Sequence, residues 1–308
     1  MLFKKLFFIY FIFFLTFFNY LKSQEITIIS KIDNTIITNI DIEIEKKYLL
    51  LLNNNLKSLS EKELFKLSKN SLVREIIKKK EVDKLFLKQN EKIEKSIIEN
   101  FYKRLGFNKK SELIKFLDKK KINFTNLKEK LVIEALWNQA IYRKFNNKIR
   151  IDENLIKKEI INYYKSKDKK YEYNLSEIVV ENEKNFNIKK KEIYKYIKKF
   201  GFKTAAIKFS KSETSKFGGE IGWIRGTRLS KEIKNKISIT NIGQITEPIQ
   251  TSNGYLFLKL NDKKEIVEKL NLEKELKQQI IFEKNRQLNQ FSFNYYKKLK
   301  KNTVIYEN

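Results

Sequence analysis

Glycine and proline are concentrated in one stretch of this chain, residues 217–262, and this stretch constrains the fold more than any other. Six of the eight glycines lie between Gly218 and Gly254, and the only proline, Pro248, lies there too. Glycine supplies turns and close backbone approaches that other residues resist, and proline fixes the local backbone. The stretch therefore predicts a set of tight turns between short elements.

The sequence around these turns predicts an ordered series of elements. Apolar spacing gives strands where it alternates and helices where it recurs every three or four residues. The predicted order is a strand at 173–180, a basic helix at 190–200, a helical turn at 205–207, a glycine loop at 218–224, a helix at 229–237, an extended run at 245–250 and a strand at 255–260.

This order, with its motifs, resembles the parvulin domain of peptidyl-prolyl isomerases. LSEIVV stands where that family has its LxHIL strand, and FSKSETSKFGGEIGW stands where it has the YS…GGDLGW loop. IGQITEPIQTSNGYLFLKL corresponds to the family's VGEIxxPVxTxxGxHIIKV tail. The resemblance implies a small module with an antiparallel-rich sheet.

The resemblance also implies where an isomerase site lies. Prolyl isomerisation needs no nucleophile, because the enzyme lowers a barrier of roughly 18–20 kcal/mol by holding the twisted imide in preference to the planar one. Parvulins place two histidines on neighbouring strands beside an acidic or thiol group. Here the histidine positions fall on Glu177 and Leu256, and the third falls on Ser212 or Glu213, depending on how the loop is aligned. The chain contains no histidine, so we expect a degenerate site.

The apolar clamp that parvulins use for the proline ring is only partly present. Ile221 and Leu229 are suitably apolar, but the family's phenylalanine position is Ile233, which removes an aromatic wall. Because proton transfer is not required, weak residual activity is physically possible. We expect the module to serve mainly as a binding and spacing unit. The residues expected to contact extended peptide are Ile221, Trp223, Leu229, Ile233 and Tyr255.

The first 23 residues have the layout of a secretory signal peptide. Lys4 and Lys5 precede an uncharged apolar run from Leu6 to Phe18, and Ser23 offers a small residue for cleavage. An uncleaved membrane anchor is the alternative, although the run from Leu6 to Leu21 is shorter than the roughly 20 residues that cross a bilayer. This pattern predicts export, and without the segment no stable membrane insertion is expected.

The two ends of the remaining chain predict strands that meet. Residues 25–40 alternate around Asp33 and Asn34, which indicates a hairpin, and Asn39 or Asp41 is expected to cap the helix that follows. Residues 60–145 are helical in period almost throughout, and a long helix is expected from Lys264 to Leu299. The apolar strand at 303–306 needs a partner, for which the hairpin is the candidate.

The whole arrangement resembles the SurA-type periplasmic chaperones, with one parvulin module where the best-known type has two. The resemblance implies an α+β protein that holds unfolded outer-membrane β-barrel proteins, or other extended polypeptide, without ATP. The expected organisation is a signal peptide at 1–23, a helical chaperone domain at 24–168, a parvulin-like domain at 169–263, and a C-terminal helix and strand at 264–308 that return to the helical domain. An aromatic cradle for client could be lined by Phe101, Tyr102, Phe107, Phe116, Phe124 and Trp137.

The composition limits the other functions. The net charge is +29, but lysine is spread over every helix and no reader motif accompanies it, so we expect no nucleic-acid partner. The absence of cysteine removes disulfides and thiolate chemistry. No P-loop, metal-ligand cluster or nucleophilic triad is present, so we expect no cofactor or metal. A working prolyl isomerase and a membrane-anchored parvulin-like chaperone remain as alternatives.

Overall fold

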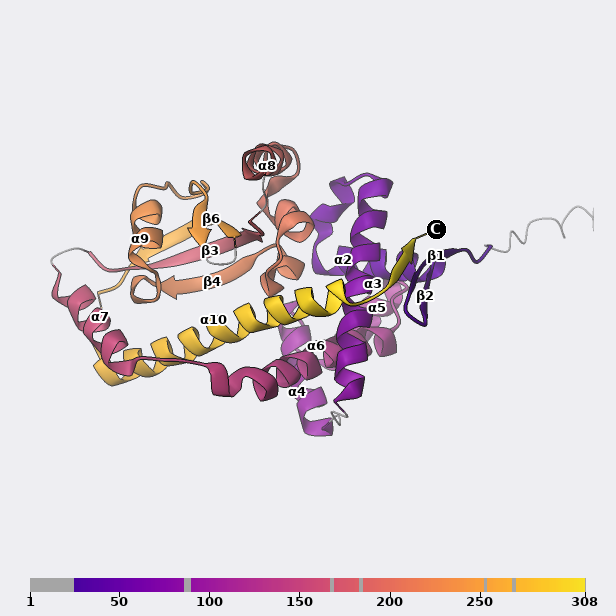
Figure 1. Ribbon diagram of the computed structural model, residues 1–308, viewed down its shortest axis with the longest axis horizontal. Helices are drawn as coiled ribbons and strands as arrows, with labels where there is room; N and C mark the ends of the chain where they lie inside the picture. Colours follow the sequence, from indigo (N-terminus) through magenta and orange to yellow (C-terminus); the bar gives the residue numbers. More distant parts are fainter. Residues whose placement is uncertain are drawn as a thin grey trace, which may run out of the picture.

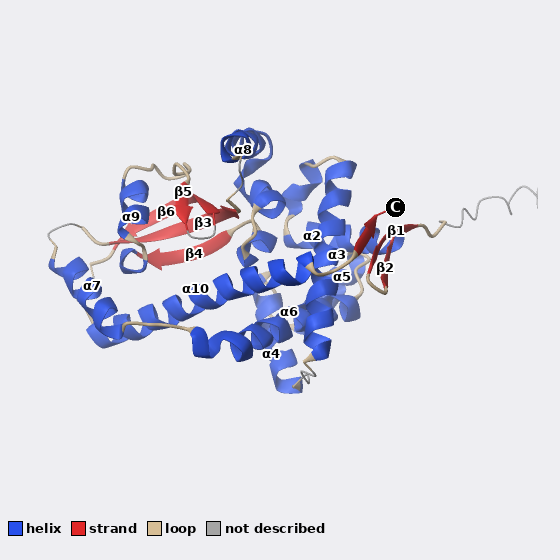
Figure 2. Ribbon diagram, in the orientation of Figure 1, coloured by secondary structure: helices blue, strands red, loops and turns tan. Residues whose placement is uncertain are grey.

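The computed structural model describes residues 25–85, 90–166, 169–182, 185–251, 254–267 and 270–307. The predicted signal peptide, residues 1–23, lies outside these described residues. Within them the chain is mostly helical, with two small antiparallel sheets, in agreement with the predicted α+β class. The helices of residues 39–145 gather at one end of the molecule and the larger sheet lies at the other, while one long helix runs beside both (Figures 1 and 2).

The smaller sheet joins the two ends of the described chain. β1 (Ile28–Ile32) and β2 (Thr35–Thr38) form the predicted hairpin, and its turn places Asp33 at a φ of 49°. β7 (Ile305–Glu307) pairs antiparallel with β1, so the strand order is β2-β1-β7. The pairing predicted for the C-terminal strand is therefore confirmed, and the other elements lie between the two halves of this sheet in sequence.

Five helices follow the hairpin and build the helical part. They are α2 (Asn39–Leu52), α3 (Glu61–Lys84), α4 (Glu91–Arg104), α5 (Lys110–Lys119) and α6 (Phe124–Phe145). Ser60 and Glu63 form a capping box at the start of α3. The predicted cap of α2 was wrong, because Thr38 is the N-cap, and Asp41, the third residue of the helix, completes the capping box.

Two helices connect this helical part with the larger sheet. α7 (Glu153–Lys165) leads toward the sheet, and α10 (Leu272–Lys301) returns from it, with the two helices packed side by side (Figure 1). The predicted start of α10 at Lys264 was wrong. The preceding strand continues to Glu265, because Tyr171 and Glu172 of the neighbouring strand give it a partner there. Asn271 then caps α10 by accepting a hydrogen bond from the Lys274 N–H at 3.0 Å.

The larger sheet has the strand order β4-β3-β6-β5, with every pair antiparallel. β3 (Tyr171–Val180) is central beside β6 (Gly254–Glu265), while β4 (Glu220–Arg225) and β5 (Ile249–Thr251) are the edges. α8 (Phe186–Phe209) and α9 (Lys231–Ser238) complete the module. Gly201, at a φ of 81°, breaks α8 into the two helical pieces that the sequence predicts.

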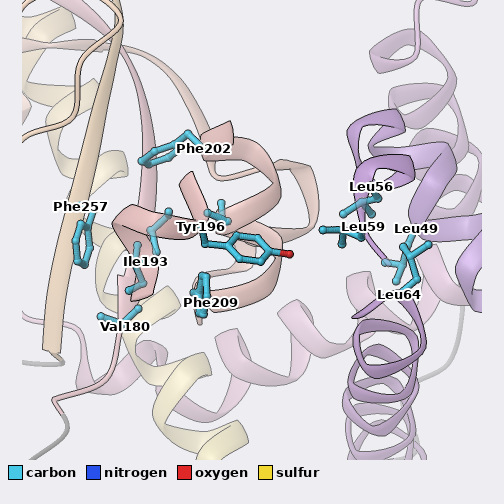
Figure 3. Packing of buried hydrophobic residues seen from close by; sticks show 13 residues of the cluster. Leu49, Leu56, Leu59, Leu64, Val180, Ile193, Tyr196, Phe202, Phe209 and Phe257 are labelled. Carbon is cyan, nitrogen blue, oxygen red and sulfur yellow. The ribbon is translucent and has the colours of Figure 1, made fainter. Parts of the chain in front are cut away.

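An apolar cluster continues from this module into the helical part. Ile178, Val180 and Phe257 of the sheet pack with Tyr196 and other residues of α8, and the cluster also includes leucines from α2, the segment after it and α3. Tyr196 points toward these leucines (Figure 3). The leucines are Leu49, Leu56, Leu59 and Leu64. The module and the helical part therefore share buried apolar surface, which stabilises their contact by the hydrophobic effect.

Candidate peptide-binding site

The two positions predicted for the family's histidines lie together on one face of the larger sheet. Glu177 of β3 is paired with Leu258 of β6, and Leu256 is two residues from Leu258. Side chains two residues apart on a strand share a face, so Glu177 and Leu256 are diagonal neighbours. The structure thus brings these two predicted site residues together, with a carboxyl and an aliphatic side chain where two imidazoles are implied by the resemblance.

Glu177 is held by hydroxyl groups from the loop after α8. The Thr214 hydroxyl donates to Glu177 Oε1 at 2.9 Å, and it also shares a hydrogen bond with the Ser212 hydroxyl. Burial raises the pKa of the Glu177 carboxyl above its ordinary value, although the hydrogen bonds from Thr214 and Ser212 act to lower it. Ser212 is therefore part of the predicted site, while Thr214 is a partner that the motif alignment did not identify.

The apolar clamp residues gather on the same face of the sheet. Leu229 is buried, and Ile221, Ile233 and Leu256 are partly buried against the same cluster. Gly222 has a φ of 86°, and the register shifts beside it, so this irregularity in β4 turns Ile221 toward the cluster. Phe282 of α10 also packs on this cluster. It comes from outside the predicted module, so the family motifs could not point to it.

Two residues predicted to contact peptide lie elsewhere. Tyr255 is adjacent to Leu256 in the strand and so points to the opposite face, where its ring stacks on Phe186 with centroids 3.4 Å apart. Trp223 is 41% exposed and belongs to neither apolar cluster of the sheet, with the Lys264 ammonium 4.6 Å from its ring centroid. The geometry therefore separates Tyr255 and Trp223 from the clamp formed by Ile221, Leu229 and Ile233.

Glu213, the other residue considered for the acidic position, contacts the helical part. Its carboxylate lies 3.0 Å from the ammonium of Lys78 in α3, which is completely buried and also contacts Glu134 of α6 at 2.9 Å. Lys216 lies 2.6 Å from Glu134. This ion cluster around the buried Lys78, which also contains the partly exposed Glu134, Glu213 and Lys216, attaches the loop after α8 to α3 and α6. Sequence patterns could not predict this cluster, since Lys78 and Glu213 are 135 residues apart.

The residues predicted for an aromatic cradle are mainly packing residues. Trp137 is fully buried, and its indole N–H donates to Ser292 of α10 at 2.8 Å, so it is not available to client. Phe101 is also buried. Phe107 and Phe116 contact one another with ring centroids 5.2 Å apart. Tyr102, Phe107 and Phe124 are partly buried against the cluster that contains Phe101. The arrangement in this helical part is that of a core, as buried aromatic residues usually adopt.

The sequence of the module matches a known domain family. Residues 174–262 match the rotamase family, described as a PPIC-type PPIase domain. The chain carries a PPIC-type domain. The matched residues include Glu177 on β3, Ser212 in the loop after α8, the clamp residues and Leu256 on β6.

Longer matches relate the chain to chaperones and foldases. It is 26% identical to Chaperone SurA of Pseudomonas putida over 154 residues, which cover 46% of this chain and 36% of SurA. It is 33% identical to Foldase protein PrsA 4 of Bacillus cereus over 165 residues, which cover 52% of each chain. The chain thus spans between about a third and a half of the length of these two relatives. The predicted resemblance to SurA-type chaperones with a parvulin module is confirmed.

A solved structure from a study of two SurA-like chaperones in Campylobacter jejuni matches 92% of this chain and 99% of the solved chain, at 14% identity and a TM-score of 0.38.

In the part of the chain that the structure describes, no helix combines the length and apolar character that a membrane span requires.

Proposed function

We propose that this protein is an ATP-independent periplasmic chaperone that holds unfolded polypeptide, in particular outer-membrane β-barrel proteins. We also propose that its PPIC-type domain binds polypeptide but does not isomerise prolyl bonds efficiently. The relationship to SurA and PrsA supports the first part. The second part rests on the site itself, where Glu177 and Leu256 lie at the implied histidine positions.

The contacts of Glu177 are the observation that carries the proposal. Its carboxyl group accepts a hydrogen bond from Thr214, and Leu256 offers no polar atom beside it. Catalysis requires groups that favour the twisted imide over the planar ground state. The Glu177 carboxyl already accepts a hydrogen bond from a loop hydroxyl, and its neighbour Leu256 is aliphatic. This pair does not reproduce two neighbouring imidazoles. Ile221 and Ile233 of the clamp, together with Leu256, are only partly buried and still offer apolar surface to a polypeptide.

Aggregation suppression and prolyl isomerisation, measured on the same sample of residues 24–308, test the proposal. We expect substoichiometric to equimolar protein to slow aggregation of an unfolded outer-membrane barrel protein, without ATP. We expect the rate of isomerisation of a proline peptide to stay near that of buffer. Aggregation at the rate seen without the protein contradicts the chaperone function, and rapid isomerisation supports the working-enzyme alternative.

A matched pair of variants tests whether the clamp contacts client. Ile233→Glu places a charge in the partly buried clamp, whereas Ile239→Glu makes the same change at a side chain that is 81% exposed just after α9. We expect the first variant to suppress aggregation less well than the second, with both showing the circular dichroism of the wild type. Equal suppression by the two variants would remove the clamp from the proposal.

Export is part of the same proposal and has its own test. Amino-terminal sequencing of the protein from a cell's periplasmic fraction is expected to begin at Gln24. Recovery of the chain in the membrane fraction with Met1 retained supports the anchored alternative instead.

A further inference from the structure

A basic cleft with a volume of about 670 Å³ lies where α3, the segment after α8 and the end of α10 meet. Seven lysine and arginine side chains line this cleft, against two glutamates. They come from α3, from the end of α8 with the segment after it, and from α10, which are far apart in sequence, and the carboxyl end of α10 reaches α3 (Figure 1). Clefts lined by one sign of charge raise the local concentration of ligands of the opposite sign.

Part of this charge is balanced within the protein and part is not. Lys208 contacts Glu63 at 3.0 Å, and Lys297 contacts Glu181 at 3.3 Å. Lys216 belongs to the ion cluster around Lys78. Lys300 and Lys301, by contrast, are exposed and form no salt bridge with any carboxylate in the described ranges. Lys300 lies near Glu307, which the Lys69 ammonium already contacts, and no described carboxylate balances Lys301, so the cleft keeps positive charge at the end of α10 for an anionic ligand.

Helix stability alone does not account for this arrangement. Lysines in the last turn of α10 interact favourably with the negative end of the helix dipole, which explains Lys300 and Lys301 as single residues. The dipole of α10 does not account for Arg74 of α3, which donates a hydrogen bond to the Tyr296 hydroxyl and lies near Glu213, or for Lys211 after α8, and both line the same cleft. Convergence of like charges costs free energy, which an anionic ligand would offset.

The remaining lining of the cleft indicates the class of ligand. Leu67, Ile207 and Phe293 provide apolar surface among the cations. An extended polypeptide alternates its side chains, so it can direct carboxylates to the lysines and apolar groups to these three residues. A membrane surface is too broad to enter a concave site between three elements. We propose that this cleft binds acidic segments of unfolded polypeptide, an inference that rests on the proposed chaperone function and assigns it a substrate preference.

Fluorescence anisotropy with a labelled twelve-residue peptide, in which Glu and Asp alternate with Phe and Leu, tests the cleft in the full mature chain. The double variant Lys300→Glu and Lys301→Glu reverses two charges at the end of α10. The matched control, Lys119→Glu and Lys120→Glu, makes the same change at the exposed end of α5. We expect the cleft variant to bind the peptide about tenfold or more weakly than the control, with the affinity of the wild type falling as salt is added.

Three further measurements complete the test. A peptide with Gln and Asn in place of Glu and Asp is expected to bind at least tenfold more weakly to the wild type. Equal binding of the two peptides, or an equal loss in both double variants, overturns the inference. Binding to vesicles of anionic phospholipid is measured for the same variants. If the cleft variant loses only vesicle binding and keeps peptide binding, the ligand is a membrane and the inference is overturned. Aggregation suppression is measured in parallel. If the protein still suppresses aggregation but the cleft variant binds the peptide as well as the control does, the proposed function stands and only this inference is removed.

Discussion

At the scale of single residues, Lys78 is the side chain whose removal is expected to cost the most. It is fully buried, and its ammonium contacts Glu134 at 2.9 Å and Glu213 at 3.0 Å. Lys78→Met leaves these carboxylates without that cation, and removal of one partner from a buried ion pair typically costs about 3–5 kcal/mol. Urea unfolding followed by tryptophan fluorescence measures this, since the ammonium lies 5.4 Å from the ring centroid of Trp137. Lys79→Met, at the exposed neighbour, is the control, and a similar midpoint for both variants would contradict the prediction.

The same ion cluster predicts a dependence of stability on pH. Burial opposes ionisation of Glu134, but the ammonium groups of Lys216 and Lys78 outweigh it and lower its pKa to about 2, from an ordinary value of 4.5. A folded-state pKa below the unfolded value stabilises the protein above pH 4.5 and loses this effect as the pH falls toward 2. The free energy of unfolding of the wild type minus that of Glu134→Gln is therefore expected to be constant from pH 7 to 5 and to shrink between pH 4.5 and 3. Glu129→Gln, at an exposed position on α6, should show no such trend, and a constant difference for Glu134→Gln down to pH 3 would refute the argument.

At the scale of elements, the turn before β4 depends on a glycine that permits close backbone approach. A Cβ on Gly219 would lie 2.2 Å from the carbonyl oxygen of Glu177, whereas a Cβ on Gly201 would meet nothing within 4 Å. Both have a φ near 80°, so both alanine variants carry the strain of a positive φ, about 1–3 kcal/mol. Gly219→Ala is expected to lose more, about 3 kcal/mol or above, because β3 must also move. Urea midpoints of the two variants measure the difference, and equal midpoints mean that the steric contact is relieved without cost.

The same elements show which parts of the structure the sequence could predict. The hairpin around Asp33, the α3 capping box and the break at Gly201 were predictable because each depends on residues close in the chain. The clamp of Ile221, Leu229 and Ile233 was found through family motifs, and the structure brings those residues together. The contacts of Glu213 with Lys78, and of Phe282 with the clamp, depend on how distant elements pack, and no local pattern carries that information.

At the scale of the whole molecule, α10 joins the PPIC-type domain to the helical part. Near its start, the buried Glu275 accepts hydrogen bonds from Arg225 at 2.8 Å and from the Thr227 hydroxyl at 2.6 Å. Toward its other end, Ser292 accepts the hydrogen bond from the buried Trp137. One rigid helix with a polar attachment at each end should make the two parts unfold together, so a single urea transition is expected for the wild type.

Glu275→Ala is expected to uncouple them. The variant leaves the Thr227 hydroxyl without its acceptor and removes the Glu275 carboxylate from Arg225, whose partners also include Glu172 at 3.1 Å and the Tyr164 hydroxyl at 3.4 Å. Loss of one member of such a buried network costs about 3 kcal/mol, and this cost falls on the contact between α10 and the domain. Trp223 lies in the domain and Trp137 in the helical part, so single-tryptophan variants can follow each part separately. The transition read by Trp223 should move to lower urea than the one read by Trp137, while Glu273→Ala, in the same helical turn but exposed, keeps them coincident. Coincident transitions in Glu275→Ala would mean that the shared apolar cluster and the Lys78 ion cluster alone hold the two parts together.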